Sequence, residues 1–461
     1  MKKLVCLFLI FSTVFSFVGC SFINEQISSS SINGVSLRDY SIVYSDEDLD
    51  YSKRAAEYIQ TQIKERAGIT IDLVEDSAEP VTEYEIVVGN TDRDISDRLD
   101  AKTEGLQFAM LCEEKQIALE GDYFIIAAAA YFFIETYVPE ANYKATIPEG
   151  ESIHSPIVKE AKNYIVLIGD GMGFNQTKMF EYLKNNIDYS DGEDIFYGYY
   201  LPYQGQSKTN SVSGVTDSAA GGTAIACGYK TVNGNIGLDK NEKVIKSLTE
   251  LAYEKGMSAG VMSTERKTGA TPASFSAHAV DRNESAEIIA SQAEARDYYG
   301  TIIDCGYDYY TKNYMTVIER HITDTLTKLE ENENGFFLMY EEAHIDKHCH
   351  NNELDKVFQA VVRFNQAIGR FMEYAFYNPD TFILITADHE TGDLYANAQG
   401  VLEFHSGDHT GKNVPIFAYG DGAELCEGVA IENIQIAHTI GHFMGDDNFG
   451  DQSKFSYLGK E

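Results

Sequence analysis

Basic residues are scarce in this chain: 36 Lys and Arg stand against 72 Asp and Glu, and the 461 residues carry a formal net charge of −36 at pH 7. Partners with a phosphate backbone are held mainly by clustered basic side chains, so the composition argues against nucleic-acid binding. Tryptophan is absent, yet hydrophobic residues make up an ordinary 44%. We therefore expect an acidic globular protein, long enough for one large domain and a smaller one.

Cysteine is also scarce, with seven residues and no CxxC pair. Cys6 and Cys20 lie in the N-terminal leader. The five others are Cys112, Cys227, Cys305, Cys349 and Cys426. An odd number without paired spacing argues against a disulfide scaffold and against a Cys-rich metal site. One or two disulfide bonds stay open on the sequence alone.

Long hydrophobic runs are missing except at residues 4–18, which follow Met1-Lys2-Lys3 and are too short for a comfortable membrane span. This pattern is typical of an export signal. Its end, Phe17-Val18-Gly19-Cys20-Ser21, resembles a bacterial lipobox, in which the cysteine becomes the lipidated first residue; the alternative is a cysteine near a cleavage site by chance. We expect a lipoprotein signal peptide at 1–19, a flexible tether at 20–31, and anchoring through Cys20 to the bacterial cell membrane, facing outside the cytoplasm.

Residues 32–150 alternate short apolar segments with helical ones. The segment 83–91 weakly resembles the small accessory α/β domain found ahead of catalytic domains in some glycoside hydrolases. No catalytic constellation occurs here, so we expect an accessory domain whose role stays open. The expected strands are 41–44, 69–74, 84–88 and 106–119, and the expected helices are 50–67 and 123–137.

From residue 163 to 461, short apolar strands alternate with helical segments. This order predicts a mostly parallel sheet with helices on both faces, and ligands bind such sheets beyond the carboxyl ends of the strands. The expected strands are 164–168, 259–262, 336–340, 381–385 and 414–419. Candidate ligands follow several of them, and Asp346 and His350 have the i, i+4 spacing that places two ligands on one helix face.

The segment 211–224 predicts a helix with Ser218 in its first turn. Free backbone N–H groups and the helix dipole favour an anion there, which places the Ser218 hydroxyl to attack a phosphoryl group. An Asp-Ser pair before an Ala run is also an ordinary helix N-cap, so this segment alone leaves both interpretations open.

Six motifs together resemble the alkaline phosphatase family, in the family's order and over about residues 163–446. They are Asp170-Gly171-Met172-Gly173, Thr216-Asp217-Ser218-Ala219-Ala220, Ala270-Thr271-Pro272-Ala273, Ile345-Asp346-Lys347 with His350, Thr386-Ala387-Asp388-His389, and His409-Thr410-Gly411. The resemblance implies an α/β fold: a three-layer sandwich with a mostly parallel central sheet, preceded here by the accessory domain.

The same resemblance implies two Zn²⁺ ions and one Mg²⁺ ion. Asp346, His350 and His409 would hold the first zinc. Asp388, His389, Asp170 and the Ser218 oxygen would hold the second. Asp170, Thr271 and Glu341 would hold magnesium, Arg282 would clamp two phosphate oxygens, and Lys347 would contact phosphate.

These roles have physical reasons. Zinc stabilises the Ser218 alkoxide and the leaving oxygen, and it lowers the pKa of the water that then hydrolyses the phosphoserine. The expected activity is hydrolysis of small phosphate monoesters, with release of inorganic phosphate. The resemblance implies a homodimer, whereas the added N-terminal domain favours a blocked interface, and the sequence leaves both open.

The sequence departs from the family at Gly269, where many relatives carry Asp or His beside the third ion. The identity and occupancy of that ion are therefore open. Without an acidic partner there, we expect Lys347 to be freer to approach the substrate and bind phosphate more tightly.

Two other classes of function stay open. One is a phosphodiesterase or phosphonate hydrolase of the same superfamily; a sulfatase is disfavoured because its Cys/Ser-x-Pro-x-Arg motif is absent. The other is a surface lipoprotein that only binds metal or ligand. We expect His344 and His348 at the surface and Glu342 solvated or locally paired, with His405 ambiguous between the cleft rim and no role.

Overall fold

The computed structural model describes residues 29–46, 50–78, 81–99, 101–113, 115–183, 194–306 and 314–460. The predicted signal peptide, Cys20 and most of the predicted tether lie outside them. No helix of the described segments is both long and apolar enough to cross a membrane. Five cysteines lie within these segments and all five are free thiols, so no disulfide bond forms there.

A sheet of eight strands forms the larger unit. Its order is β13 (Ile302–Cys305), β12 (Ser258–Ser263), β14 (Phe336–Glu342), β10 (Asn163–Gly169), β15 (Thr381–Thr386), β20 (Val414–Tyr419), β11 (Tyr203–Lys208) and β21 (Ala430–Glu432). The first five strands are parallel, and β20 is antiparallel to both of its neighbours. The predicted mostly parallel sheet is confirmed.

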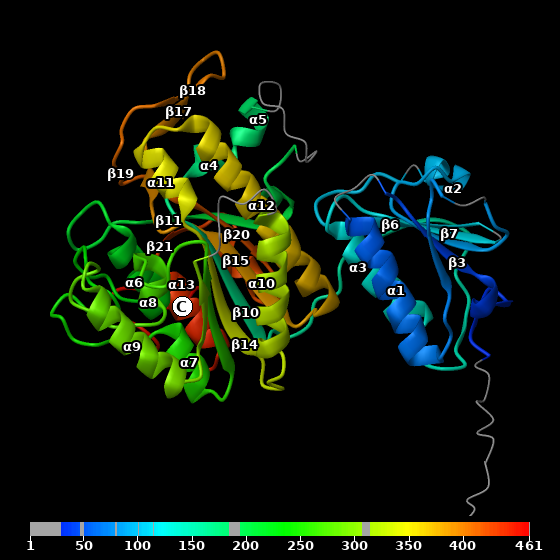
Figure 1. Ribbon diagram of the computed structural model, residues 1–461, viewed down its shortest axis with the longest axis horizontal. Coiled ribbons are helices and arrows are strands. Elements are labelled where there is room, and N and C mark those ends of the chain that lie inside the picture. The colour runs from blue at the N-terminus through cyan, green and yellow to red at the C-terminus, as the bar shows by residue number, and fades with distance from the viewer. Residues whose placement is uncertain are drawn as a thin grey trace, which may run out of the picture.

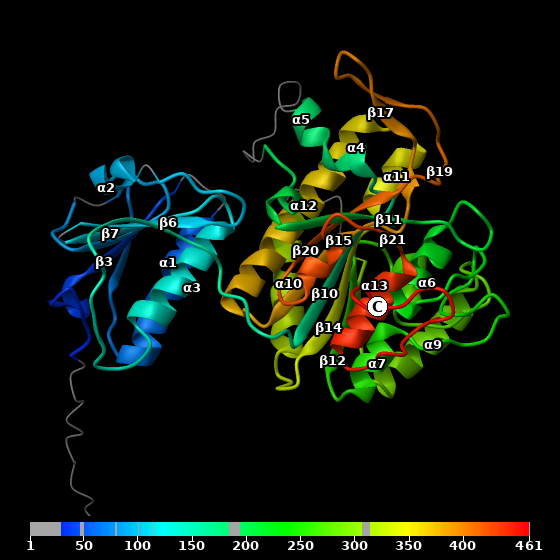
Figure 2. The same ribbon diagram turned by 180° about the vertical axis from the view of Figure 1, so that it is seen from behind.

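Helices cover both faces of this sheet (Figures 1 and 2). On β10, Ile165 and Leu167 belong to the buried cluster of α12, whereas Val166 and Ile168 belong to the cluster of α7 and α13. Successive side chains of a strand point to opposite faces, so this alternation defines three layers. The flanking helices are α10 (Tyr314–Leu329) and α12 (Leu354–Tyr377) on one face, and α6 (Ser218–Cys227), α7 (Leu248–Glu254) and α13 (Ile434–Phe443) on the other.

The N-terminal unit has a six-stranded sheet of its own. Its order is β4 (Asp72–Glu75), β3 (Ser41–Tyr44), β5 (Glu85–Val88), β7 (Gln116–Glu120), β6 (Phe108–Glu113) and β9 (Gly150–His154), with helices α1 (Tyr51–Ala67), α2 (Asp94–Arg98) and α3 (Ile125–Tyr137) and a small sheet of β2 (Val35–Ser36), β1 (Ser31–Ile32) and β8 (Lys144–Ala145). The prediction of one strand over 106–119 is wrong, because β6 ends at Glu113, β7 begins at Gln116, and the two strands pair antiparallel. β9 extends this unit past residue 150.

The two units meet where α1 and α3 pack against α12 (Figure 1). The rings of Phe124 and Phe376 lie 5.9 Å apart, and those of Tyr58 and Tyr377 stack at 4.1 Å. Beside them, Arg54 Nε donates to Glu373 Oε1 over 2.9 Å. The contact is therefore an apolar, aromatic interface with a partly buried ion pair at its edge.

Replacing Arg54 with alanine should lower the free energy of unfolding by about 2 kcal/mol, because it leaves the Glu373 carboxylate, 10% exposed, with Arg370 as its remaining ion-pair partner among the described residues. Urea unfolding followed by circular dichroism measures the change. Lys64→Ala removes an exposed cation from the same helix and is the matched control. Equal effects of the two substitutions would show that the ion pair does not hold the units together.

Candidate active site

Three neighbouring strands deliver acidic and imidazole side chains to one edge of the large sheet. Ile168 of β10 pairs with Glu341 of β14 on one side and with Thr386 of β15 on the other. Asp170 follows β10, and Asp388 and His389 follow β15. Asp170 and Asp388 each lie two residues beyond the paired residues Ile168 and Thr386. Parallel strands end at the same edge, so these side chains converge.

Ser218 is the first residue of α6 and is 3% exposed. Its Oγ lies 3.2 Å from His389 Nε2. The preceding Asp217 is the N-cap, since its Oδ1 accepts from Ala220 N over 2.9 Å. The cap interpretation is confirmed for Asp217, which leaves the hydroxyl of Ser218 free of the capping role and directed at His389.

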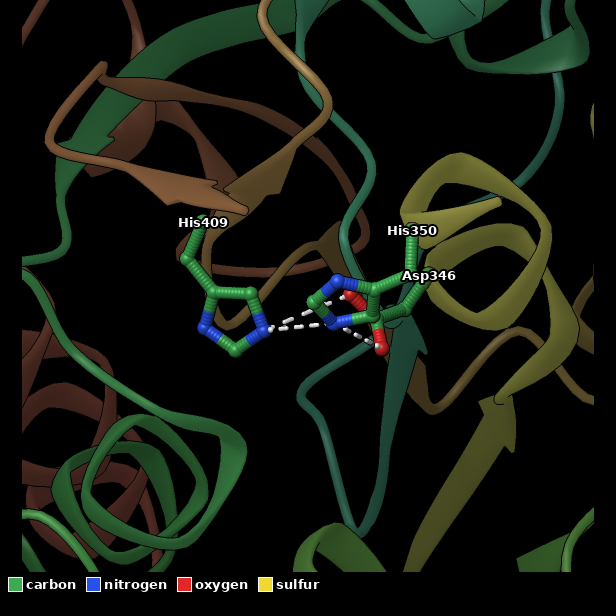
Figure 3. Close-up of side chains that lie close together, drawn as sticks. All are labelled: Asp346, His350 and His409. Atoms are coloured by element: carbon green, nitrogen blue, oxygen red, sulfur yellow. Dashed lines mark hydrogen bonds and ion pairs between the residues drawn. The ribbon is translucent and has the colours of Figure 1, made fainter. Parts of the chain in front are cut away.

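Asp346, His350 and His409 face one another across the mouth of the site (Figure 3). His350 Nε2 lies 3.3 Å from Asp346 Oδ2, and His409 Nε2 lies 3.5 Å from Asp346 Oδ1. Asp346 and His350 share a face of α11 (His344–His350), as the i, i+4 spacing predicts. The hydrogen bond to Asp346 raises the pKa of His350 to about 9, so this position strongly favours positive charge.

The outer nitrogens of the two histidines are held by backbone carbonyls. His350 Nδ1 lies 2.6 Å from Gly407 O, and His409 Nδ1 lies 2.9 Å from Thr216 O. Each carbonyl favours a proton on Nδ1, and removal of the proton that His350 Nε2 shares with Asp346 would leave two Nε2 lone pairs turned inward, 3.1 Å apart. Such a pair with a carboxylate between them suits a divalent cation, and zinc in particular.

A second group lies deeper, around His389. Its Nε2 is 3.5 Å from Asp170 Oδ1 and 3.3 Å from Asp388 Oδ2, and neither oxygen accepts a hydrogen bond from the described residues. Burial raises the pKa of Asp388 to about 7, and burial together with Asp388 raises that of Asp170. Burial lowers the pKa of His389. These two oxygens without donors, Asp170 Oδ1 and Asp388 Oδ2, lie beside a neutral imidazole and fit a second divalent cation next to Ser218.

Thr271 and Glu341 form a third, oxygen-rich corner. Thr271 lies on the short α8 (Ala270–Ser274), and its Oγ1 and Glu341 Oε1 are buried without a hydrogen-bond partner among the described residues. Glu341 Oε2 accepts from Ser263 Oγ. Burial, then the charge of Glu265, raises the pKa of Glu341 to about 8. The donors here are all oxygen, which suits magnesium.

The two cationic side chains expected to contact phosphate are both paired with carboxylates. Arg282 Nη1 donates to Asp217 Oδ2 over 3.1 Å, which places the guanidinium beside the start of α6. Lys347 Nζ lies 3.1 Å from Glu265 Oε1. Residue 269 offers Lys347 no acidic partner, as expected, but Glu265 supplies one from a different position, so Lys347 is not left unpaired.

Some neighbours of the site differ from expectation. The surface prediction for His344 and His348 is wrong: both are buried, because His344 pairs with the equally buried Glu342 and His348 pairs with Glu353. Glu342 is locally paired, one of its two expected states. His405 lies near Asp393 in the hairpin β17 (Leu394–Ala396) and β18 (Leu402–Phe404).

Sequence reasoning missed Thr391, which connects the groups, and included Gly171 only as part of its motif. Thr391 Oγ1 donates to Asp346 Oδ1 over 2.5 Å and lies 3.1 Å from His389 Nδ1, so it links the first and second groups. Gly171 has φ of +76°, and a side chain there would meet Asp346 Cα at 2.8 Å. Only glycine fits this close approach, and the Asp170-Gly171 pair was its visible signal.

Comparisons with known proteins agree on one family. The family model described as alkaline phosphatase matches residues 161–310 and 310–399. Alkaline phosphatase 4 of Bacillus subtilis is 29% identical over 304 residues, covering 54% of this chain and 65% of the relative. Alkaline phosphatase of Escherichia coli is 25% identical over 387 residues, covering 58% and 82%. The chain thus spans about two thirds or less of the length of some of these relatives.

Solved structures give the same result. The alkaline phosphatase of the Antarctic bacterium TAB5 matches with a TM-score of 0.55 and 26% identity, over 62% of this chain and 99% of that one. A histidine-to-glutamate mutant of that enzyme, with Mg bound in its M3 site, matches with a TM-score of 0.53 and 26% identity over the same shares. The family match begins after the N-terminal unit.

Proposed function

Because the chain belongs to the alkaline phosphatase family, we propose that it hydrolyses small phosphate monoesters in two steps, through a phosphoserine on Ser218, with two zinc ions and one magnesium ion bound. The observation that carries the proposal is the position of Ser218 Oγ, 3.2 Å from His389 Nε2 at the N-terminus of α6. Beside His389 Nε2 lie Asp170 Oδ1 and Asp388 Oδ2, two buried oxygens that accept no hydrogen bond from the described residues.

Bound zinc supplies positive charge that lowers the pKa of the Ser218 hydroxyl and of the attacking water. The chain's own residues do the remaining work. The N-terminal N–H groups of α6 favour the phosphoryl anion, and Asp217 caps that helix while it also holds Arg282 in place. Arg282 then offers a planar pair of donors to two phosphate oxygens.

The monoester preference follows from counting oxygens. A monoester dianion has three terminal oxygens, whereas a diester has two and one negative charge fewer. A pocket that combines Arg282 with a cluster of cation-binding carboxylates and imidazoles gains most from the fully charged substrate.

The test is a substrate panel on zinc- and magnesium-loaded protein, with metal content measured on the same sample. We expect an aryl phosphate to be turned over with a higher kcat/KM than its bis-aryl diester, the aryl phosphonate monoester or the aryl sulfate. Faster turnover of the diester or of the phosphonate would show that the protein is a phosphodiesterase or a phosphonate hydrolase instead. Zinc bound without any ester hydrolysis would favour a binding lipoprotein.

Arg282→Lys should raise both the KM for an aryl phosphate and the inhibition constant of inorganic phosphate by about tenfold, because a point charge replaces a two-pronged hydrogen bond. Steady-state kinetics with phosphate as inhibitor measures both constants. Arg296→Lys, an exposed arginine paired with Asp297 on α9 (Ser285–Asp297), is the matched control. An unchanged phosphate inhibition constant in Arg282→Lys would show that Arg282 does not bind the phosphate group.

We also propose that the mature protein is exported and held at the bacterial membrane by a lipid on Cys20. The support is the sequence: a charged start, the apolar run 4–18 and the lipobox-like end at Cys20. Wild-type protein should fractionate with membranes and be released by detergent, whereas Cys20→Ala should not carry the lipid. Incorporation of labelled palmitate into both forms equally, or into neither, would contradict the anchor.

A further inference from the structure

Gly269 is a glycine for reasons of space and not of backbone conformation. Its φ is −60° and its ψ is 152°, a conformation that other residues adopt freely. A Cβ at this position would lie 2.5 Å from Glu265 Oε2 and 2.7 Å from Glu265 Cδ. The carboxylate of Glu265 therefore occupies the place where a side chain of residue 269 would begin.

Two contacts hold Glu265 in position. Its backbone N donates to Ser263 Oγ over 2.9 Å, and the same hydroxyl donates to Glu341 Oε2. Its Oε1 accepts from Lys347 Nζ over 3.1 Å. The Ser263 hydroxyl therefore links the backbone of Glu265 to the carboxylate of Glu341.

Several carboxylate and hydroxyl oxygens of neighbouring residues lack hydrogen-bond donors. Glu341 Oε1, Thr271 Oγ1 and Asp170 Oδ1 are all buried, and no described residue donates a hydrogen bond to them. Buried polar atoms are normally satisfied, so three such oxygens together indicate a bound cation. With Glu265 the donors are three carboxylates and a hydroxyl, and the absence of imidazole and thiolate among them favours magnesium over zinc.

We propose that Glu265 is a ligand of the magnesium ion, and that it supplies from the loop between β12 and α8 the carboxylate that Gly269 cannot. The inference rests on the proposed function only in taking this corner as the third ion site. Lys347 balances the charge of Glu265 through its contact with Oε1. Glycine at 269 is required because any larger residue would displace that carboxylate.

The test is calorimetric titration of Mg²⁺ into zinc-loaded, magnesium-free protein. Glu341→Gln should abolish the binding event, which identifies the site. Glu265→Gln should weaken Mg²⁺ binding by at least about tenfold without changing the zinc content of two ions per chain. Gly269→Ala should weaken it as well, because the new Cβ displaces the carboxylate of an intact Glu265.

Two further variants separate a ligand from a structural role. Lys347→Ala keeps the carboxylate and removes its cationic neighbour, so Mg²⁺ affinity should stay the same or rise. The double variant Glu265→Ala with Gly269→Asp moves the carboxylate to the glycine position, and most of the affinity lost in Glu265→Ala should return.

Unchanged Mg²⁺ affinity in Glu265→Gln would overturn the inference, and so would an equal loss in Lys347→Ala or a wild-type protein that binds no Mg²⁺. Because binding is read without substrate, its outcome is independent of the proposed function. A protein that binds Mg²⁺ through Glu265 but hydrolyses no phosphate ester would refute the activity and leave this ligand in place.

Discussion

Ser218→Ala is expected to lower kcat for an aryl phosphate by at least about a thousandfold while the bound ions and the fold remain. Without Oγ no phosphoserine can form, and water would have to attack the substrate directly. The substitution removes a single buried oxygen from the first turn of α6, whose cap, Asp217, is untouched. The loss should therefore appear in turnover and not in stability.

Two measurements check this expectation. Steady-state assays give kcat, and acid quenching after mixing with a ³²P-labelled aryl phosphate traps the covalent intermediate. Wild-type protein should retain label on the peptide that contains Ser218, and the variant should retain none. Circular dichroism and zinc analysis establish that both proteins are equally folded and equally loaded.

Ser213→Ala is the matched control, since this serine is exposed, lies five residues earlier and accepts a hydrogen bond from Asn233 N over 3.0 Å. Its activity should stay within about threefold of wild type. Turnover by Ser218→Ala at the wild-type rate would exclude Ser218 as the nucleophile. A similar loss in both variants would assign the effect to the segment before α6.

The sequence predicts those parts of the site that depend on regular structure. Asp170 and Asp388 each follow an apolar strand, and parallel strands end at one edge, so their convergence is a consequence of the fold. Asp346 and His350 are four residues apart, which is enough to place them on one face of a helix. The position of Ser218 in the first turn of a helix is predictable for a similar reason, because a capping residue fixes where the helix begins.

The parts that the sequence does not reveal depend on contacts across the fold. His344 and His348 look like surface residues on a helical wheel, yet other elements cover them and carboxylates pair with them. Glu265 is more instructive. The sequence places Glu265 in a loop but does not give the direction of its side chain. Only the structure shows that the Glu265 carboxylate occupies the space beside Gly269. A missing side chain is visible in the sequence, but the residue that replaces it is visible only in three dimensions.

Asp346→Asn should remove one of the two zinc ions and lower kcat/KM by at least about a hundredfold. The amide keeps the size of the side chain and its contact with Thr391, but it loses the negative charge that lies 3.3 Å from His350 Nε2 and 3.5 Å from His409 Nε2. Loss of a residue that only orients a ligand typically weakens metal binding about 10–100-fold, so loss of a direct ligand should cost at least as much.

Metal analysis after gel filtration, combined with steady-state kinetics, checks the Asp346 prediction. Asp393→Asn is the control, because this aspartate is paired with Lys412 at the rim and its left-handed backbone accepts asparagine. Excess zinc should restore part of the activity of Asp346→Asn, since both histidines remain, but none of the activity of Ser218→Ala. That difference separates a residue that binds the ion from the residue that the ion activates, and two tightly bound zinc ions with normal turnover in Asp346→Asn would disprove the assignment of Asp346.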